Sequence, residues 1–154
     1  MKDQRIFIVG AGQMGAGIAQ VALQSGLSVE LNDTAQAFVD KGKERILKNF
    51  RASVAKGRMD EGAANSAAEK LSCSVSFERI AEADLVIEAI TENPEAKKQL
   101  FAKIDALCGE KTVFASNTSS ISITELAAST KRSDRFIGMH FFNPVPVMKL
   151  LEIT

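Results

Sequence analysis

The chain contains one histidine, His140, and a carboxylate, Glu152, follows it after a short proline-containing segment, residues 143–147. Both lie in apolar segments that are typical of strands. Residues separated by an even number on an antiparallel pair share a face, so these two side chains are expected to meet. A carboxylate beside an imidazole fixes its tautomer and stabilises its protonated form, which suits a general base for a substrate hydroxyl. The alternative, on the histidine alone, is a satisfied core side chain.

A polar cluster, residues 116–120 (SNTSS), directly follows a buried apolar strand. In open α/β sheets ligands bind at the carboxyl ends of strands, and this cluster lies at such an end. Asn117 and Ser119 are therefore candidates for hydrogen bonds to a ligand, whereas Ser120 or Ser122 is expected to cap a helix. Three more polar side chains are expected on this rim or just beyond it: Glu92, Lys97 and Asn143.

A glycine-rich turn near the start of the chain is typical of phosphate binding. The apolar run Ile6–Val9 leads into residues 10–15 (GAGQMG), a G-x-G-x-x-G sequence, and an amphipathic helix follows at once. Gly10 permits the tight turn, Gly12 leaves the backbone open to a pyrophosphate, and Gly15 lets the helix approach its strand. The helix directs free N–H groups and its positive dipole end at the phosphates. The first helical residues, Gln13 and Met14, complete this predicted binding turn.

An acidic residue after the second strand indicates which dinucleotide binds. The segment Leu27–Leu31 is predicted to be a strand, and Asp33 follows it, 21 residues after Gly12. An acidic residue at this place accepts hydrogen bonds from ribose hydroxyls and would repel a 2′-phosphate. No Arg or Lys occurs among residues 34–37, so the sequence predicts NAD rather than NADP. The weaker alternative is a structural βαβ unit with coincidental glycines.

The elements that must position these residues alternate between strands and helices. We expect strands at 6–9, 27–31, 75–77, 83–90, 112–115, 135–142 and 149–153, and helices at 14–24, 38–56, 60–71, 94–107 and 123–128. This alternation predicts a Rossmann-type α/β fold, a doubly wound and mostly parallel sheet, over residues 1–154. The last two strands, joined by about five residues, must be antiparallel because a parallel pair needs a longer crossover. The long helical pair after the second strand is an insertion.

Composition is typical of a soluble globular domain. The 154 residues are 45% hydrophobic, and 19 basic residues balance 19 acidic ones. A net charge near zero gives no general attraction to nucleic acid or to a membrane surface. The two cysteines lack metal-ligand spacing, no apolar run reaches membrane-spanning length, and the first strand leaves no room for a leader. We therefore expect a cytoplasmic protein without a metal.

Four segments together resemble the 3-hydroxyacyl-CoA dehydrogenases, with the bacterial 3-hydroxybutyryl-CoA enzymes as the nearest group. They are residues 10–20 (GAGQMGAGIAQ), 87–93 (IEAITEN), 114–121 (FASNTSSI) and 138–152 (GMHFFNPVPVMKLLE). The resemblance covers nearly the whole chain. It implies the interconversion of L-3-hydroxyacyl-CoA and 3-ketoacyl-CoA with NAD, in fatty-acid oxidation or a butyrate-type pathway.

The resemblance also implies a role for each matching residue. His140 would be the catalytic base and Glu152 its orienting partner, while Ser119 would bind the substrate's 3-oxygen near the nicotinamide. Asp33 would hold the ribose, and the cofactor cleft would be lined by Glu92, Lys97 and Asn143. The long helical pair, rich in Lys and Arg, would seat coenzyme A with Lys56 on a phosphate. For most of these cations the alternative is a solvated helix face.

The resemblance covers only the NAD-binding domain of that family, whose all-helical second domain closes the substrate cleft and forms the homodimer. Little activity is therefore expected of these residues alone. A noncatalytic dinucleotide-binding module is one alternative, but binding alone does not need His140, Glu152, Ser119 and Asn117 together. A dehydrogenase for small hydroxy acids is another, although those enzymes usually place a catalytic lysine in their other domain.

Overall fold

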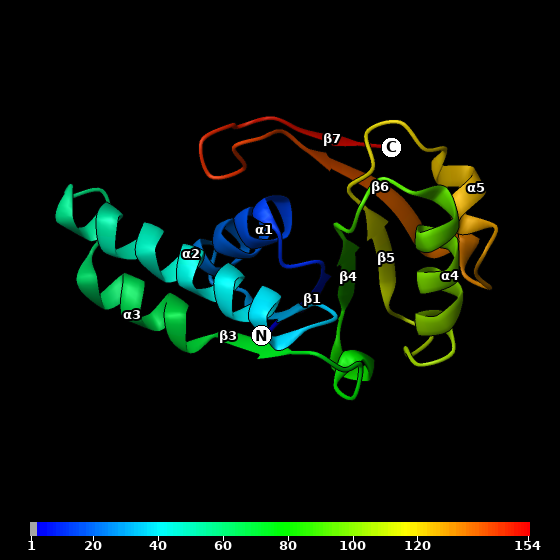
Figure 1. Ribbon diagram of the computed structural model, residues 1–154, viewed down its shortest axis with the longest axis horizontal. Coiled ribbons are helices and arrows are strands. Elements are labelled where there is room, and N and C mark those ends of the chain that lie inside the picture. Colours follow the sequence, from blue (N-terminus) through cyan, green and yellow to red (C-terminus); the bar gives the residue numbers. More distant parts are fainter. Residues whose placement is uncertain (1–2) are drawn as a thin grey trace.

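Seven strands form one sheet in the order β3-β2-β1-β4-β5-β6-β7 in the computed structural model, which describes residues 3–154 (Figure 1). The strands are β1 (Arg5–Val9), β2 (Ser28–Asn32), β3 (Leu71–Ser74), β4 (Leu85–Glu88), β5 (Val113–Ser116), β6 (Phe136–Phe141) and β7 (Leu151–Ile153). The helices are α1 (Gln13–Gln24), α2 (Gln36–Ala55), α3 (Glu61–Glu69), α4 (Pro94–Asp105) and α5 (Ile123–Ala127), with 3₁₀ turns η1 (Ile80–Glu82) and η2 (Ser133–Arg135). Neighbouring strands from β3 to β6 pair in parallel, and β7 pairs antiparallel with β6.

Side chains on strand β1 alternate between two hydrophobic cores. Ile6 and Ile8 of β1 pack in one core with residues of α1, α2 and α3. Phe7 and Val9 pack in the other core, where Phe101 of α4 is fully buried. Because successive strand residues point to opposite faces, a nearly continuous apolar run is required here to bury both sides of the sheet.

The expected doubly wound sheet with two closing antiparallel strands is confirmed, and two boundaries need correction. The strand expected at residues 75–77 lies instead at Leu71–Ser74, where it pairs with β2, and α3 therefore ends before it at Glu69. The connection between β6 and β7 covers residues 142–150, longer than the five residues expected. Ser122 caps a helix, one of the two possibilities expected: its side chain accepts from Glu125 N, and the side chain of Asp60 caps α3 in the same way by accepting from Ala63 N.

The expected helical pair extends beyond the β3 side of the sheet, with α2 and α3 lying side by side (Figure 1). Val39, Ile46 and Phe50 form the buried face of α2, at the spacing of an amphipathic helix. The other face of α2 is mostly charged and exposed. Among residues 3–154, no helix combines the length and apolar character needed to cross a bilayer.

Candidate active site

The glycine turn after β1 has the geometry that a pyrophosphate requires. Gly10 has a φ of +111°, and a Cβ on Gly15 would lie 1.7 Å from the Gly10 carbonyl oxygen. A Cβ on Gly12 would meet nothing within 4 Å, so the space beside this backbone is open. No side chain caps α1, which leaves the N–H groups of its first turn free for a ligand. The turn therefore fits the phosphates of a dinucleotide.

Asp33 lies beside this turn, directly after β2. Its Oδ2 accepts a hydrogen bond from the Ala11 N–H at 2.8 Å, and its Oδ1 accepts one from the Thr34 N–H at 2.7 Å. The carboxylate thus fixes the backbone of the glycine turn as well as presenting negative charge at the carboxyl end of the sheet. The predicted ribose-binding residue and the predicted phosphate-binding turn are in direct contact.

His140 and Glu152 face each other across the β6–β7 pair. They are direct partners in the antiparallel register, and Nδ1 of His140 lies 3.3 Å from Oε2 of Glu152. The imidazole also packs on Phe142, with ring centroids 4.5 Å apart. Because Nδ1 faces the carboxylate, Nε2 is the nitrogen available to a substrate proton. The alternative of a core histidine does not apply, since the side chain is 27% exposed.

Glu92 joins the rim of β4 to the polar segment after β5. It accepts hydrogen bonds from the backbone N–H of Ser119 at 2.9 Å, the Ser119 hydroxyl at 3.0 Å and the Thr118 hydroxyl at 2.7 Å. Burial raises the pKa of Glu92, but these hydrogen bonds and the Lys97 ammonium outweigh it and hold the pKa below its usual range. Glu92 is therefore ionised at neutral pH and positions Ser119.

A second carboxylate, Glu88, lies fully buried behind this rim. It accepts hydrogen bonds from Lys97, from the Ser116 hydroxyl at 2.5 Å and from the Ile90 N–H at 2.8 Å. The Lys97 ammonium also lies 3.4 Å from Glu92. Lys97 thus connects a buried carboxylate to one on the rim, and each charge in the chain of three has a partner.

A pocket of about 330 Å³ lies at the carboxyl ends of β4, β5 and β6. Seven of the predicted site residues line it: Met14, Glu92, Lys97, Asn117, Ser119, His140 and Asn143. A second hollow of about 590 Å³, which Glu152 also lines, lies against Ser119 and His140 and is bordered by α5. Ser119 and His140 therefore lie between two spaces.

Two asparagines join the segments that surround the pocket. Oδ1 of Asn117 accepts from the Phe141 N–H at 2.9 Å, which ties the end of β5 to β6. Oδ1 of Asn143 accepts from the Gln13 amide at 3.0 Å, which ties the β6–β7 connection to α1. The sequence indicated Asn117 as a ligand contact, and the Nδ2 amino group of its side chain makes no hydrogen bond to the described residues, so it can donate to a ligand.

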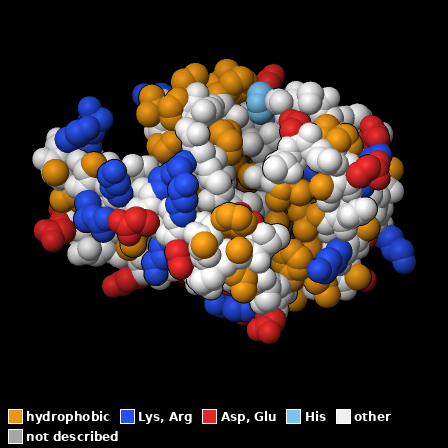
Figure 2. Space-filling view, viewed as in Figure 1, with side chains coloured by type: hydrophobic (Ala, Val, Ile, Leu, Met, Phe, Trp, Pro, Cys, Tyr) orange, Lys and Arg blue, Asp and Glu red, His pale blue; other side chains and the backbone are white. Residues whose placement is uncertain are grey.

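Lys56 lies apart from the catalytic residues, in a groove of about 870 Å³. The groove runs between α1, the end of α2, the start of α3 and residues 143–147, and Arg45 and Arg58 also line it. Figure 2 shows Lys and Arg side chains gathered over the protruding helical pair. Because Gln13 and Asn143 border this groove and Asn143 also borders the 330 Å³ pocket, the two spaces adjoin.

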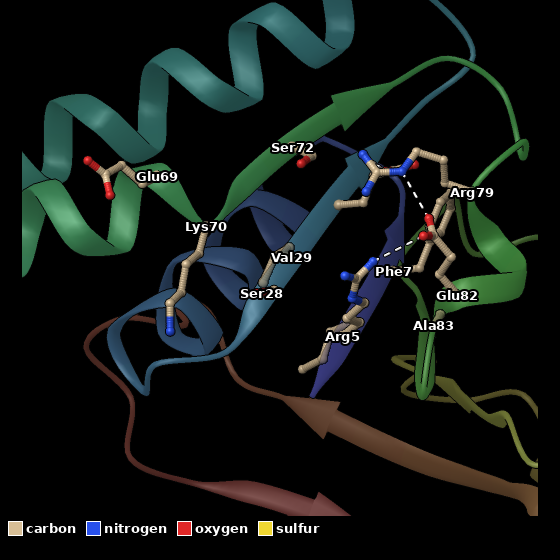
Figure 3. Close-up of a pocket in the computed structure, with 12 residues that line it drawn as sticks. Arg5, Phe7, Ser28, Val29, Glu69, Lys70, Ser72, Arg79, Glu82 and Ala83 are labelled. Carbon is tan, nitrogen blue, oxygen red and sulfur yellow. Dashed lines mark hydrogen bonds and ion pairs between the residues drawn. The ribbon is translucent and has the colours of Figure 1, made fainter. Parts of the chain in front are cut away.

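A further hollow of about 200 Å³ lies at the opposite, amino ends of the strands (Figure 3). Four of its charged groups form ion pairs: Glu82 accepts from Arg5 at 3.2 Å and from Arg79 at 3.0 Å, and Arg79 also lies 3.5 Å from Glu30. These mostly exposed ion pairs hold η1 against β1 and β2, and the Lys70 ammonium, which also lines the hollow, donates to a backbone carbonyl at 2.9 Å. We assign this hollow a structural role.

Comparison with known protein families identifies the family to which this dinucleotide-binding fold belongs. Residues 5–154 match the family described as 3-hydroxyacyl-CoA dehydrogenase, NAD binding domain. The chain belongs to this family. The match confirms the expected NAD cofactor and the expected resemblance to 3-hydroxybutyryl-CoA dehydrogenases.

Individual members of the family agree with the match. The chain is 45% identical to a probable 3-hydroxybutyryl-CoA dehydrogenase of Bacillus subtilis over 99% of its own length and 53% of the relative. It is 45% identical to the mitochondrial hydroxyacyl-coenzyme A dehydrogenase of Sus scrofa, over 98% of this chain and 50% of the relative. The crystal structure of (S)-3-hydroxybutyryl-CoA dehydrogenase from Ralstonia eutropha superposes with a TM-score of 0.95 at 46% identity, over 99% of this chain and 54% of that one. The chain thus spans about half the length of these dehydrogenases.

Sequence reasoning missed two residues of the site, Thr118 and Glu88. Thr118 is buried and binds Glu92, although it lies inside the polar segment that the sequence did indicate. Glu88 is a carboxylate inside an apolar strand, and that contrast was the available signal. A fully buried carboxylate requires a partner, which in this case is Lys97 from α4.

Proposed function

We propose that this chain is the NAD-binding and catalytic domain of an L-3-hydroxyacyl-CoA dehydrogenase. The observation that carries the proposal is the direct pairing of His140 with Glu152 beside Ser119, in a pocket that adjoins the glycine turn. NAD binding alone would not require an imidazole–carboxylate pair there. The relatives named as hydroxyacyl-CoA and 3-hydroxybutyryl-CoA dehydrogenases support the same reaction class.

In the proposed reaction His140 is the general base. Nε2 of His140 takes the proton from the substrate's 3-hydroxyl as that carbon is oxidised to the ketone, and returns it in the reverse direction. Glu152 holds the ring through Nδ1 and stabilises the imidazolium that forms. NAD, when bound, supplies the two-electron chemistry of this oxidation.

Ser119 is proposed to bind the substrate's 3-oxygen. The substrate's 3-hydroxyl has a single proton, which His140 accepts, so Ser119 must donate its own proton to a lone pair of the 3-oxygen; in the present structure the Ser119 hydroxyl donates to Glu92. To donate to the 3-oxygen the hydroxyl must rotate away from Glu92, whose other hydrogen bonds, from Thr118 and the Ser119 N–H, remain. Ser119 can thus serve both forms of the substrate while Glu92 stays in place.

The cofactor is proposed to lie along the carboxyl ends of the strands. The turn with Gly10, Gly12 and Gly15 would hold the pyrophosphate, and Asp33 would accept hydrogen bonds from the adenosine ribose. The rest of the cleft would be formed by Gln13, Met14, Glu92, Lys97, Asn117 and Asn143. A positively charged groove adjoins this cleft at Lys56, where we place a phosphate of coenzyme A.

The test is NAD- and substrate-dependent turnover by the chain. Because the chain spans about half the length of its relatives, acetoacetyl-CoA should cause a slow loss of NADH absorbance, at a rate still well above that of His140→Gln at the same protein concentration. NADH binding without turnover, at the level of His140→Gln, would contradict the catalytic assignment and favour a noncatalytic dinucleotide-binding module. Lys56→Ala should raise the KM for acetoacetyl-CoA without raising it for a pantetheine thioester, which lacks the nucleotide phosphates.

A further inference from the structure

Helix α1 contains a glycine that the phosphate-binding turn does not need. Gly17 lies beyond the G-x-G-x-x-G residues, and a Cβ built on it would lie 2.9 Å from Cβ of Val145 and 3.2 Å from its Cγ2. Ordinary contacts of this kind fall at 3.4–4 Å. Glycine is a poor helix former, so its presence inside α1 needs a reason, and this close approach supplies one.

Val145 anchors the segment that joins the two strands of the catalytic pair. It is 5% exposed, and it is the only buried residue among residues 142–150. It packs in the same hydrophobic core as α1. All three residues of β7 are exposed, and Val145 provides the buried apolar contact that holds the β6–β7 connection to the rest of the domain.

A second contact lies one helical turn away on the same face of α1. Gln13, four residues before Gly17, donates to Asn143 at 3.0 Å. Helix α1 therefore meets the connection at two points, one apolar and one polar. The helix begins at the glycine turn, and the connection leads directly to His140 on one side and Glu152 on the other.

We infer that Gly17 is a positioning residue, which sets the distance between the cofactor-binding turn and the His140–Glu152 pair by admitting Val145 against α1. This inference rests on the proposed function. A methyl group at position 17 would push Val145 outward by about 0.5–1 Å to restore ordinary contact. A misplacement of about 1 Å can cost about 100-fold in rate when two groups must align for reaction.

The experiment is a double-mutant cycle with Gly17→Ala and Val145→Gly. We expect Gly17→Ala to lower kcat for acetoacetyl-CoA reduction at least about tenfold, with the Kd for NADH changed less than about threefold. Val145→Gly removes both the Cβ and the Cγ2 that a methyl group at position 17 would meet, so the double variant should return to the kcat of Val145→Gly. Gly109→Ala is the matched control, because a Cβ there would meet nothing within 4 Å, and its kcat should equal that of the unchanged chain.

A second readout needs neither cofactor nor turnover. His140 is the only histidine, and its ring lies 4.5 Å from that of Phe142 at the start of the connection. A displaced connection changes the ring current at His140, so Gly17→Ala should move the imidazole proton signals in the NMR spectrum of the free chain. The double variant should move them back toward those of Val145→Gly. If Gly17→Ala does not fold, Val145→Ile adds a methyl group at the same contact and is tested in its place.

The outcomes separate this inference from the proposed function. Turnover by the unchanged chain with an unaltered kcat in Gly17→Ala would overturn only the inference. Unchanged His140 signals in Gly17→Ala would also overturn the inference. So would a decrease in kcat that persists in the double variant, or an effect of Gly17→Ala on the Kd for NADH rather than on kcat. If the unchanged chain binds NADH without turnover, the proposed function fails, and the NMR signals alone decide whether Gly17 positions His140.

Discussion

Replacing Glu152 with glutamine tests whether this carboxylate stabilises charge on His140. Oε2 of Glu152 lies 3.3 Å from Nδ1 of His140, and the Glu152 side chain is 57% exposed. For unit charges at this separation in a nearly aqueous dielectric, the attraction is about 1 kcal/mol. Glutamine keeps the size of the side chain but removes this attraction. The oxidation of the alcohol, in which His140 gains a proton, should slow by about five- to tenfold.

The assay follows NADH formation from L-3-hydroxybutyryl-CoA and NAD at saturating concentrations of both. Glu152→Gln is compared with His140→Gln, which removes the base itself and should lower kcat by about 100-fold or more. Asp134→Asn, which neutralises an exposed carboxylate in η2, is the control and should leave kcat unchanged. The Kd for NADH should be the same in all four proteins, since none of these side chains is assigned to its binding.

Three results would refute this reasoning. A wild-type rate in Glu152→Gln would show that the carboxylate does not stabilise the imidazolium. A loss as large as that of His140→Gln would show that Glu152 acts mainly by holding the ring in place, because electrostatic attraction of about 1 kcal/mol cannot produce it. A near-normal rate in His140→Gln would remove the histidine from its role.

Three further predictions address the cofactor, the rim and the scaffold. Asp33→Asn keeps an acceptor for the glycine turn but removes the negative charge, so the ratio of NADPH to NADH Kd values should fall about tenfold, and an unchanged ratio would contradict its role in cofactor choice. The lowered pKa of Glu92 means that its ionised form stabilises the fold above the ordinary carboxyl pKa of 4.5, and that this stabilisation is lost as the pH falls through the lower folded-state pKa. Glu92→Gln should therefore lower Tm at pH 7 and lower it by less at pH 3. An equal decrease in Tm at both pH values would argue against this account. Arg132→Met breaks a buried ion pair with Asp105 at 2.6 Å and should cost about 3–5 kcal/mol in urea unfolding, against less than about 0.5 kcal/mol for the exposed control Arg51→Met; similar losses in the two variants would count against this.

Local sequence signals were sufficient where a single segment determines the structure. The phosphate-binding turn follows from the G-x-G-x-x-G sequence, because the positive φ of Gly10 and the close approach of Gly15 to the Gly10 carbonyl both lie within one strand–turn–helix unit. The starts of α3 and α5 depend on local capping. The side chains of Asp60 and Ser122 each accept a hydrogen bond from the backbone N–H three residues later. The antiparallel pairing of His140 with Glu152 likewise follows from a short connection and an even spacing.

The position of β3 could not be predicted in this way. Residues 71–74 (LSCS) are half-buried and only partly apolar, and pairing with β2 determines that they form a strand. The neighbouring segment 75–77 looks more strand-like in sequence but has no partner strand among the described residues. Strand propensity reflects the neighbours of a segment as much as its own residues, so the partner decided the boundary.

The sequence by itself therefore determined the doubly wound fold, the NAD-binding turn and the residues that could carry the chemistry. Only the tertiary structure showed how they are held: Glu88 is neutralised by Lys97 from α4, Ser119 is positioned by Glu92 from the β4 rim, and Val145 packs against Gly17. The first contact joins a strand to the helix that follows it, and the other two join segments far apart in the chain. The packing of the sheet and helices determines which residues become partners. A buried charge requires an opposite charge or a hydrogen-bond partner beside it, and a glycine is required only where a neighbouring group occupies the space of a side chain.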